Sequence, residues 1–366
     1  MFHPLRVRAV ERITDDAVAV TFDVPPELRE TFRHVPGQHL NVRYEAGGEE
    51  IRRSYSLCSP AVAPPDPPVL RVGIRLVDGG TFSTYALKEL AVGDQVEAMA
   101  PTGRFTLEPR PGLFAAVVGG SGITPVLSIA TTLLAREPLA RFCLVRGDRT
   151  VASTMFLDEV ADLKDRYPDR FHLVTALSRE EQAGGLPTGR LDQQRLTTLL
   201  PALLPVPDVA GWFLCGPYGL VRGAQGALRA LDVDRGRIHQ EIFHVEDATP
   251  PAAGTTASSA GAAEGVDGAG VTVPAEATLT ATLHGRSGSW PVESGDSLLE
   301  TVLRRRTDAP YACKGGVCGT CRAFLVRGEV RMDRNYALEP EETGAGFVLA
   351  CQSHPLTPEV TIDFDR

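Results

Sequence analysis

The sequence lacks an uninterrupted apolar stretch that would cross a membrane or serve as a signal peptide. Its N-terminal residues, MFHPLRVRAVERITDD, mix charged with apolar side chains, whereas a signal peptide needs a continuous apolar segment. Residues 113–135 carry no charge, but GGSG and Pro125 interrupt them, which favours a strand, a tight loop and a buried helix. We therefore expect a cytoplasmic protein without a membrane span.

Basic residues are outnumbered by acidic ones, and three of the cysteines have no other cysteine near them in the sequence. The formal net charge is -9, which argues against nucleic acid as a partner. Of the seven cysteines, Cys58, Cys143 and Cys215 are widely separated, a distribution that fits a reducing compartment better than a disulfide framework. The chain has 366 residues, 43% of them hydrophobic, which is enough for two or three domains with real cores.

The other four cysteines carry the strongest signal in the chain. They follow the spacing C-x4-C-x2-C with a fourth cysteine further on, which is the plant-type ferredoxin arrangement for a [2Fe-2S] centre. The four are Cys313, Cys318, Cys321 and Cys351. A structural zinc site is the alternative, although zinc knuckles usually come as two close pairs rather than as three cysteines plus one.

Three of these cysteines share the loop CKGGVCGTC, which is rich in glycine. We expect Gly315, Gly316 and Gly319 to let the backbone pass close to the inorganic sulfides and direct N–H groups at them. A side chain at these positions would crowd the cluster.

Composition divides the chain into four parts, which predict a multidomain protein. Residues 1–110 contain short Val, Thr and Phe-rich runs broken by turn sequences, a pattern typical of an antiparallel β-barrel. In residues 111–246 short apolar runs alternate with helical stretches, which predicts a parallel-sheet α/β nucleotide domain. Residues 247–274 are mainly Ala, Gly, Ser, Thr and Pro and predict a flexible linker. Residues 275–366 have ferredoxin size, for which we expect an α+β β-grasp fold.

Two segments of the barrel region resemble the flavin-binding elements of the ferredoxin-NADP reductase family. They are Arg53-Ser54-Tyr55-Ser56 and Gly79-Gly80-Thr81-Phe82-Ser83-Thr84. The resemblance implies that Arg53 pairs with the flavin pyrophosphate, that Tyr55 packs on the isoalloxazine, and that Ser56 hydrogen-bonds near N5. Ser54 belongs to the same flavin segment, and the second segment would contact phosphate through Gly80, Thr81, Phe82, Ser83 and Thr84. Taken alone, Arg53 fits a surface salt bridge and Tyr55 ordinary barrel packing.

The α/β region opens with FAAVVGGSGITPVLSIA, which predicts a strand, a glycine-rich turn and a helix with Pro125 in its first turn. Such a turn can cradle a pyrophosphate, because glycines permit close approach and a helix N-terminus is partially positive. It differs from G-x-G-x-x-G and resembles the loop of the reductase family. The expected contacts are Gly120, Ser121, Gly122, Ile123, Thr124 and Pro125.

A basic cluster is expected at the ends of two other strands. Ser178 and Arg179 follow FHLVTAL and resemble the Ser-Arg pair that holds the 2'-phosphate of NADP in that family. Arg146 and Arg149, predicted just past another strand end, would add charge at the rim of the same crevice or would be solvated loop residues. We therefore expect NADPH rather than NADH.

Two further segments are candidates for the hydride-transfer site. WFLCGPYGL would place Cys215, Gly216 and Pro217 at the carboxyl end of a buried strand, beside the nicotinamide, although most free cysteines are simply buried residues. Glu241-Ile242-Phe243 resembles the carboxylate-x-aromatic ending of the family's reductase unit, which implies Phe243 near the flavin and Glu241 near the hydride path. A surface role is the alternative for Glu241. The candidate catalytic residues are Ser56, Cys215 and Glu241.

The chain resembles a one-polypeptide reductase of an oxygenase system, because a flavin barrel, a nucleotide domain, a linker and a ferredoxin follow one another in that order. Segments such as APYACKGGVCGTC and FVLACQSHPLTPEVTIDFD resemble, more narrowly, the family of phenylacetyl-CoA epoxidase reductase subunits of phenylacetate degradation. That family implies electron transfer from NADPH through FAD to [2Fe-2S], with a multi-subunit di-iron oxygenase as acceptor. One departure is Arg146-Gly147-Asp148-Arg149, where the family pattern is Tyr-Gly-Asn-Arg.

Two alternatives remain open at this point. One is a reductase for another oxygenase, of the ring-hydroxylating or steroid hydroxylase type, with the same internal chemistry. The other is a structural protein whose cysteines bind zinc. Colour separates the latter, because flavin and iron-sulfur groups absorb visible light and zinc does not.

Overall fold

The computed structural model describes residues 1–181, 188–244, 255–258 and 277–366. The chain divides into two compact units, Met1–Glu246 and Asp247–Arg366. Within the described ranges, no helix combines the length and the apolar character that a membrane crossing needs.

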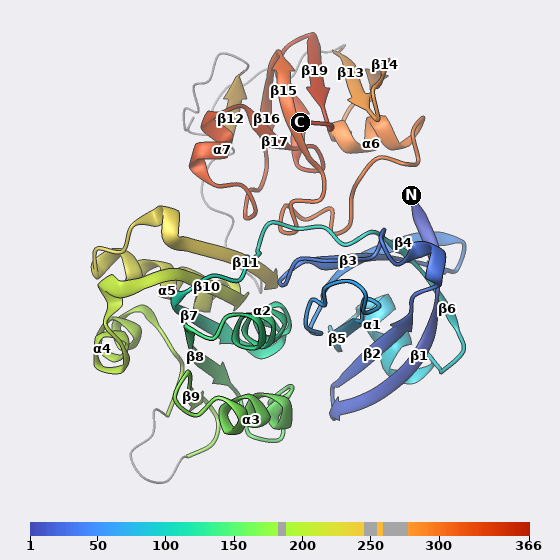
Figure 1. Cartoon of the computed structure of the whole chain (residues 1–366). Helices are drawn as coiled ribbons and strands as arrows, with labels where there is room; N and C mark the ends of the chain where they lie inside the picture. Colours follow the sequence, from blue (N-terminus) through green and yellow to red (C-terminus); the bar gives the residue numbers. More distant parts are fainter. Residues whose placement is uncertain (182–187, 245–254, 259–276) are drawn as a thin grey trace. The chain divides into compact units, whose positions relative to one another are not determined.

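The N-terminal part of the first unit is an antiparallel barrel with strand order β4-β3-β6-β1-β2-β5 (Figure 1). The strands are β1 (Phe2–Thr14), β2 (Ala17–Asp23), β3 (His39–Ala46), β4 (Glu49–Ser56), β5 (Leu70–Arg75) and β6 (Gln95–Met99), with η1 (Pro26–Leu28) and α1 (Thr81–Lys88) between them. A bridge between Leu57 and Val72 joins the end of β4 to β5, so the sheet closes on itself. Inward-facing residues and the Phe82 and Ala86 side chains of α1 form one core. The expected barrel is confirmed.

The rest of the first unit is a parallel sheet with strand order β11-β10-β7-β8-β9 (Figure 1). Its strands are β7 (Gly112–Gly119), β8 (Ala140–Asp148), β9 (Phe171–Leu177), β10 (Val209–Pro217) and β11 (Ile238–His244). The helices are α2 (Ile123–Arg136), α3 (Leu157–Arg166), α4 (Gln193–Leu203) and α5 (Tyr218–Ala230), with short η2 (Gly120–Gly122), η4 (Val206–Asp208) and η5 (Arg235–Arg237). The central strands are near-continuous apolar runs, as expected for a parallel sheet covered on both faces.

Helix α2 joins the sheet to the barrel. One core cluster contains α2 residues together with Ala17, Cys58 and Phe105 of the barrel region. Two buried hydrogen bonds reinforce it, from Ser128 Oγ to the Ser59 carbonyl at 2.7 Å and from the Ala61 N–H to Thr132 Oγ1 at 2.9 Å. The carboxyl ends of the parallel strands are therefore held against the barrel at a fixed position.

The second unit contains a five-stranded mixed sheet with order β14-β13-β19-β15-β17 and a smaller sheet with order β12-β16-β18 (Figure 1). The elements are β12 (Thr255–Ser258), β13 (Ala277–Leu283), β14 (Arg286–Val292), α6 (Leu298–Leu303), β15 (Arg322–Arg327), β16 (Glu329–Met332), α7 (Pro340–Gly344), β17 (Phe347–Leu349), β18 (Ser353–Pro355) and β19 (Glu359–Asp363). A capping box between Ser297 and Glu300 begins α6. The buried side of α6 packs into the core of the larger sheet, which gives the expected α+β unit.

The linker expected at residues 247–274 lies outside the described residues, except for one segment. Thr255–Ser258 forms β12, which pairs antiparallel with β16. Nothing in the low-complexity sequence indicates this strand, because its residues lack the alternation of large apolar side chains that is typical of β-structure. The pairing extends the exposed edge of β16 through backbone hydrogen bonds.

Candidate functional site

The segment expected to bind flavin lies on β4, where alternation directs its residues to two faces. Arg53 is exposed, and its guanidinium donates a hydrogen bond to the Arg52 carbonyl at 2.8 Å. The Tyr55 ring lies 5.4 Å from the Phe82 ring, and burial raises the pKa of Tyr55. Ser54 donates to the buried Asn41 side chain at 2.7 Å. An exposed guanidinium next to a largely buried ring fits a group with an anionic and an aromatic part.

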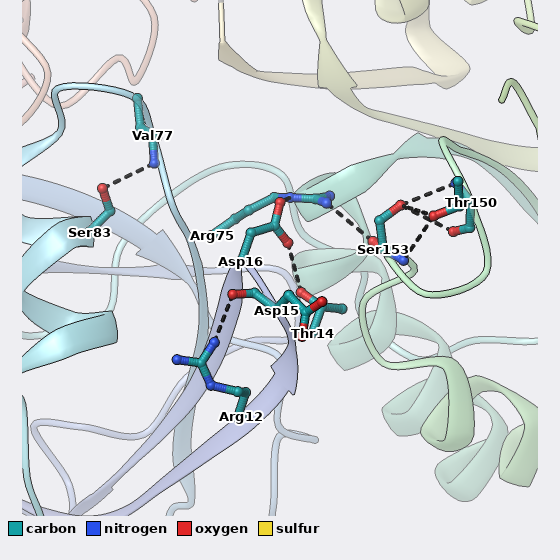
Figure 2. A network of polar contacts seen from close by, with 9 residues as sticks. All are labelled: Arg12, Thr14, Asp15, Asp16, Arg75, Val77, Ser83, Thr150 and Ser153. Atoms are coloured by element: carbon teal, nitrogen blue, oxygen red, sulfur yellow. Dashed lines mark hydrogen bonds and ion pairs between the residues drawn. The ribbon is translucent and has the colours of Figure 1, made fainter.

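The expected phosphate turn is the N-terminus of α1, with Gly80 as the N-cap residue. The first N–H groups of a helix have no intrahelical acceptor and attract anions. The Ser83 hydroxyl accepts from the Val77 N–H at 3.1 Å (Figure 2). It donates to the Gly80 carbonyl at 3.1 Å, and the Phe82 ring belongs to the barrel core. Thr81 is exposed and Thr84 half-buried. The backbone here, rather than the Ser83 or Phe82 side chains, can hold a phosphate.

The glycine-rich turn and the Cys215-Gly216-Pro217 segment come together at the ends of two neighbouring strands. A Cβ on Gly122 would overlap the Cys215 carbonyl oxygen, and a Cβ on Gly216, whose φ is +139°, would lie 2.8 Å from the Gly119 carbonyl oxygen. Glycine is therefore required for this backbone-to-backbone contact. Ile123, Thr124 and Pro125 are buried in the first turn of α2, so they can reach a ligand only through their backbone.

We expect Gly122→Ala to disrupt this junction. The added methyl group has no space beside Cys215, so the free energy of unfolding should fall by ~1–3 kcal/mol and pyridine-nucleotide binding should be lost. Gly219→Ala in α5 is the matched control, because a Cβ there meets nothing within 4 Å. Urea unfolding and nucleotide titration would check both variants. Equal behaviour of the two would contradict the close-approach argument.

Ser56, Cys215 and Glu241 converge, as expected for a common site. Ser56 Oγ donates to Glu241 Oε2 at 3.3 Å, and Cys215 is the strand partner of Glu241 between β10 and β11. Burial raises the pKa of Glu241 to about 7 and raises that of Cys215. The Glu241 side chain is 17% exposed, so a surface role for it is wrong. Phe243 is half-buried and packs against the core that contains α2.

Ser178 and Arg179 are exposed just beyond β9, and backbone hydrogen bonds tie them to the loop after β8. The Ser178 N–H donates to the Asp148 carbonyl, and the Arg179 N–H donates to the Arg149 carbonyl, both at 2.9 Å. The Arg149 side chain is exposed as well. Two arginines and a hydroxyl thus lie beside each other at the carboxyl edge of the sheet, where an anionic ligand is best placed.

Arg146 differs from the expectation. Strand β8 extends to Asp148, so Arg146 lies within the strand, and it is 1% exposed rather than at a charged rim. Its Nε donates to Asp148 Oδ2 at 2.7 Å, and its Nη2 donates to the Met155 carbonyl at 3.0 Å. Relative to the expected Tyr-Gly-Asn-Arg, Arg146 stands at the position of Tyr and Asp148 at the position of Asn. The two residues that differ from the expected pattern thus form a buried ion pair with each other.

Arg75, at the end of β5, was not among the residues expected at the site. Its Nε pairs with Asp16 Oδ2 at 2.8 Å, and its Nη2 donates to the Ser153 carbonyl at 3.2 Å (Figure 2). A Cβ on Gly120 would lie 3.3 Å from Arg75 Nη1. Arg75 thus links the barrel to the loop after β8 and borders the glycine-rich turn. A lone arginine at a strand end carries no signal of this position.

The four cysteines of the second unit meet as two pairs. Cys313 contacts Cys318, and Cys321 contacts Cys351. In the first pair the neighbouring thiol lowers the pKa of Cys313 to about 5 and raises that of Cys318. In the second pair it lowers the pKa of Cys351 and raises that of Cys321. The N–H groups of Gly315 and Cys318 point at Cys313 Sγ, at 3.3 and 3.4 Å. Within the described ranges, no three ligand side chains meet as they would around a single ion.

The loop geometry explains two of its three glycines. Gly316 and Gly319 have φ values of +77° and +68°. A Cβ on Gly316 would also lie 2.9 Å from the Arg334 carbonyl oxygen, so the crowding there comes from the protein backbone. Gly315 meets neither constraint from the protein itself, since a Cβ there would lie 3.7 Å from the Cys313 carbonyl oxygen; the crowding expected at this position is with the cluster. Thiolates in two pairs, with N–H groups directed at sulfur, fit a binuclear cluster in which each iron takes two cysteines.

Comparisons with known proteins identify three domain families along the chain. Residues 4–107 match the model of the oxidoreductase FAD-binding domain, residues 117–226 that of the oxidoreductase NAD-binding domain, and residues 281–356 that of the 2Fe-2S iron-sulfur cluster binding domain. The solved structure of phthalate dioxygenase reductase aligns over 99% of this chain and 98% of its own, with a TM-score of 0.61 and 22% identity, which supports the same fold. The expected FAD, nicotinamide nucleotide and [2Fe-2S] groups are thereby confirmed, and zinc is not.

Fold and sites together define a reductase component that passes electrons from NAD(P)H through FAD to [2Fe-2S] and on to an oxygenase. One of the subunits of 1,2-phenylacetyl-CoA epoxidase from Escherichia coli (strain K12) is 41% identical, covering 100% of this chain and 98% of its own. The ferredoxin reductase component of 3-ketosteroid-9-alpha-monooxygenase from Rhodococcus rhodochrous is 31% identical over 98% of this chain and 96% of its own. The chain belongs to the family of that 1,2-phenylacetyl-CoA epoxidase subunit.

Proposed function

We propose that the chain is the NADPH-dependent reductase of a phenylacetyl-CoA epoxidase and that its acceptor is a multi-subunit di-iron oxygenase in phenylacetate degradation. The observation that carries the proposal is the 41% identity to the Escherichia coli protein over essentially the full length of both chains. The cytoplasm is the proposed location, since a reducing compartment keeps Cys58, Cys143 and Cys215 as free thiols and prevents disulfides among the four cluster cysteines.

The residues at the carboxyl edge of the parallel sheet would bind and orient the nucleotide. The backbone of Gly120–Gly122 would hold the pyrophosphate at the start of α2, while Ser178 and Arg179, with Arg149 nearby, would bind the 2'-phosphate. Gly216 and Pro217 would shape the place of the nicotinamide beside Cys215. Positioning and exclusion of water are the work of these residues, because hydride transfer needs no strong acid or base.

The barrel would hold the flavin in the same way. Arg53 and the N–H groups at the start of α1 would bind its phosphates, and Tyr55 would pack on its ring. Ser56, held by Glu241, would hydrogen-bond near N5. When bound, FAD accepts a hydride and gives up electrons singly, and the [2Fe-2S] centre held by the four cysteines carries one electron at a time.

The decisive experiment is reconstitution with candidate oxygenases. NADPH consumption should depend both on phenylacetyl-CoA and on the epoxidase subunits, and the chain should co-purify with them. Equal or faster consumption with a steroid or ring-hydroxylating oxygenase would instead assign the chain to another acceptor.

Arg179→Ala should distinguish the two nucleotides. Loss of a charged hydrogen bond to the 2'-phosphate should raise KM for NADPH by roughly 5- to 150-fold, equivalent to ~1–3 kcal/mol. It should leave KM for NADH nearly unchanged. Arg141→Ala is the control, because Arg141 is also exposed on the sheet but lies at the opposite end of β8. Steady-state kinetics with both nucleotides would check this. Equal changes in the two KM values would remove the assigned role from Arg179.

A further inference from the structure

His39 lies beside Glu241, a proximity that no sequence pattern indicates. It is the first residue of β3, and its partner on β4 is Ser56. Two backbone hydrogen bonds with Thr102, at 2.8 and 3.0 Å, fix its main chain on the other side. Because paired residues of neighbouring strands share a face, the imidazole and the Ser56 hydroxyl both face β11.

The imidazole is enclosed, and no residue that the structure describes forms a hydrogen bond with it. His39 is 4% exposed, and neither ring nitrogen has a partner among the described residues. Its Nδ1 lies 3.7 Å from Glu241 Oε1, while Ser56 Oγ donates to the other carboxyl oxygen. Gly103, with a φ of +121°, backs the ring, and a Cβ there would lie 2.9 Å from Nδ1. A buried polar group without a partner is costly, and this ring is confined within reach of one acceptor.

The groups around the Glu241 carboxyl are His39 on β3, Ser56 on β4 and Cys215 on β10. Burial lowers the pKa of His39 to about 4 and raises the pKa of Glu241 to about 7. The imidazole is therefore neutral and keeps one N–H when the carboxyl ionises. Because the pKa of Glu241 is higher in the folded than in the unfolded protein, its contribution to folding stability is lost as the pH rises towards 7. Because the pKa of His39 is lower in the folded protein, its contribution is lost as the pH drops towards 4.

We propose that His39 is a positioning residue for Glu241: its Nδ1–H donates to Oε1 while the Ser56 hydroxyl donates to Oε2. The two donors fix both oxygens of the carboxylate and therefore the direction in which Ser56 points. This inference deepens the role proposed above for Glu241 and rests on it. Gly103 has a part in it as well, because only a residue without a side chain leaves room for the ring.

Infrared titration of the full-length protein tests the proposal. The carboxyl band of Glu241 would be identified by its absence in Glu241→Gln, and its pH midpoint compared in wild type, His39→Phe and His39→Gln. A donor to the ionised form lowers a carboxyl pKa, so His39→Phe should move the midpoint up by about one pH unit. His39→Gln keeps an N–H donor and should stay near wild type. An unchanged midpoint in His39→Phe would overturn the proposal.

A second measurement needs no His39 variant and covers the case in which His39→Phe does not fold. Nitrogen NMR of histidine-labelled protein should show a neutral His39 ring whose Nδ1 signal moves as Glu241 titrates and ceases to move in Glu241→Gln. A His39 signal indifferent to that titration would also refute the pairing. Neither readout involves nucleotide, turnover or an oxygenase, so an error in the proposed function would leave both results intact.

Discussion

Replacing Cys318 with serine should abolish the iron-sulfur absorption of the protein and its electron transfer to any one-electron acceptor. Cys318 is paired with Cys313 in the cysteine loop, and a serine oxygen is a poor substitute for a thiolate that binds iron. Reduction of the flavin by NADPH should persist, because the barrel and the parallel sheet belong to a different compact unit. Visible spectra and anaerobic reduction with NADPH would show both effects.

Cys58→Ser is the matched control for that experiment. Cys58 is a buried free cysteine in the first unit, and its thiol donates to the Arg71 carbonyl at 3.2 Å, a bond that a serine hydroxyl can replace. The control should retain the full iron-sulfur spectrum. Loss of flavin reduction in Cys318→Ser, with the control unaffected, would contradict the separation into two units.

Breaking the buried ion pair of β8 should have the largest effect on stability. Arg146→Tyr leaves the carboxylate of Asp148, which is 6% exposed, without its partner. We expect the free energy of unfolding to fall by ~3–5 kcal/mol. Urea unfolding can be followed through Trp212 in a Trp290→Phe background, because each unit contains one of the two tryptophans.

The double variant Arg146→Tyr with Asp148→Asn should recover most of that loss, because no charge then remains in the interior. This pair of residues is the one expected at these positions from the family pattern. If the single and the double variant were equally unstable, the shape of the arginine side chain rather than its charge would be what the fold requires.

The features that the sequence predicted correctly are those in which one function determines both the residue type and its spacing. The cysteine quartet could be interpreted without structure, because the spacing C-x4-C-x2-C with a distant fourth cysteine is specific to plant-type [2Fe-2S] centres. Runs broken by turn sequences likewise predicted the barrel, and apolar runs alternating with helical stretches predicted the parallel sheet. The glycines answer two different needs: Gly122 and Gly316 are required by close backbone contacts, whereas the constraint expected at Gly315 is contact with the cluster.

The remaining features depend on contacts between segments that are far apart in the chain. Arg146 was expected just past a strand end, at the rim of the crevice, yet the strand continues to Asp148 and the two charges are buried together. His39 meets Glu241 only because β3 and β4 pair at Ser56 and the nucleotide domain docks on the barrel. Local sequence contains neither relationship.

Through Arg75, the barrel holds the loop of the parallel-sheet domain that follows Arg149. Asp16 lies in the hairpin between β1 and β2, yet through Arg75 it holds the loop that follows Arg149 (Figure 2). If the crevice binds the 2'-phosphate as proposed, natural drift at this hairpin would alter nucleotide preference without changing a contact residue. Anyone retargeting such a reductase from one pyridine nucleotide to the other should diversify Asp16 and Arg75 together with the crevice.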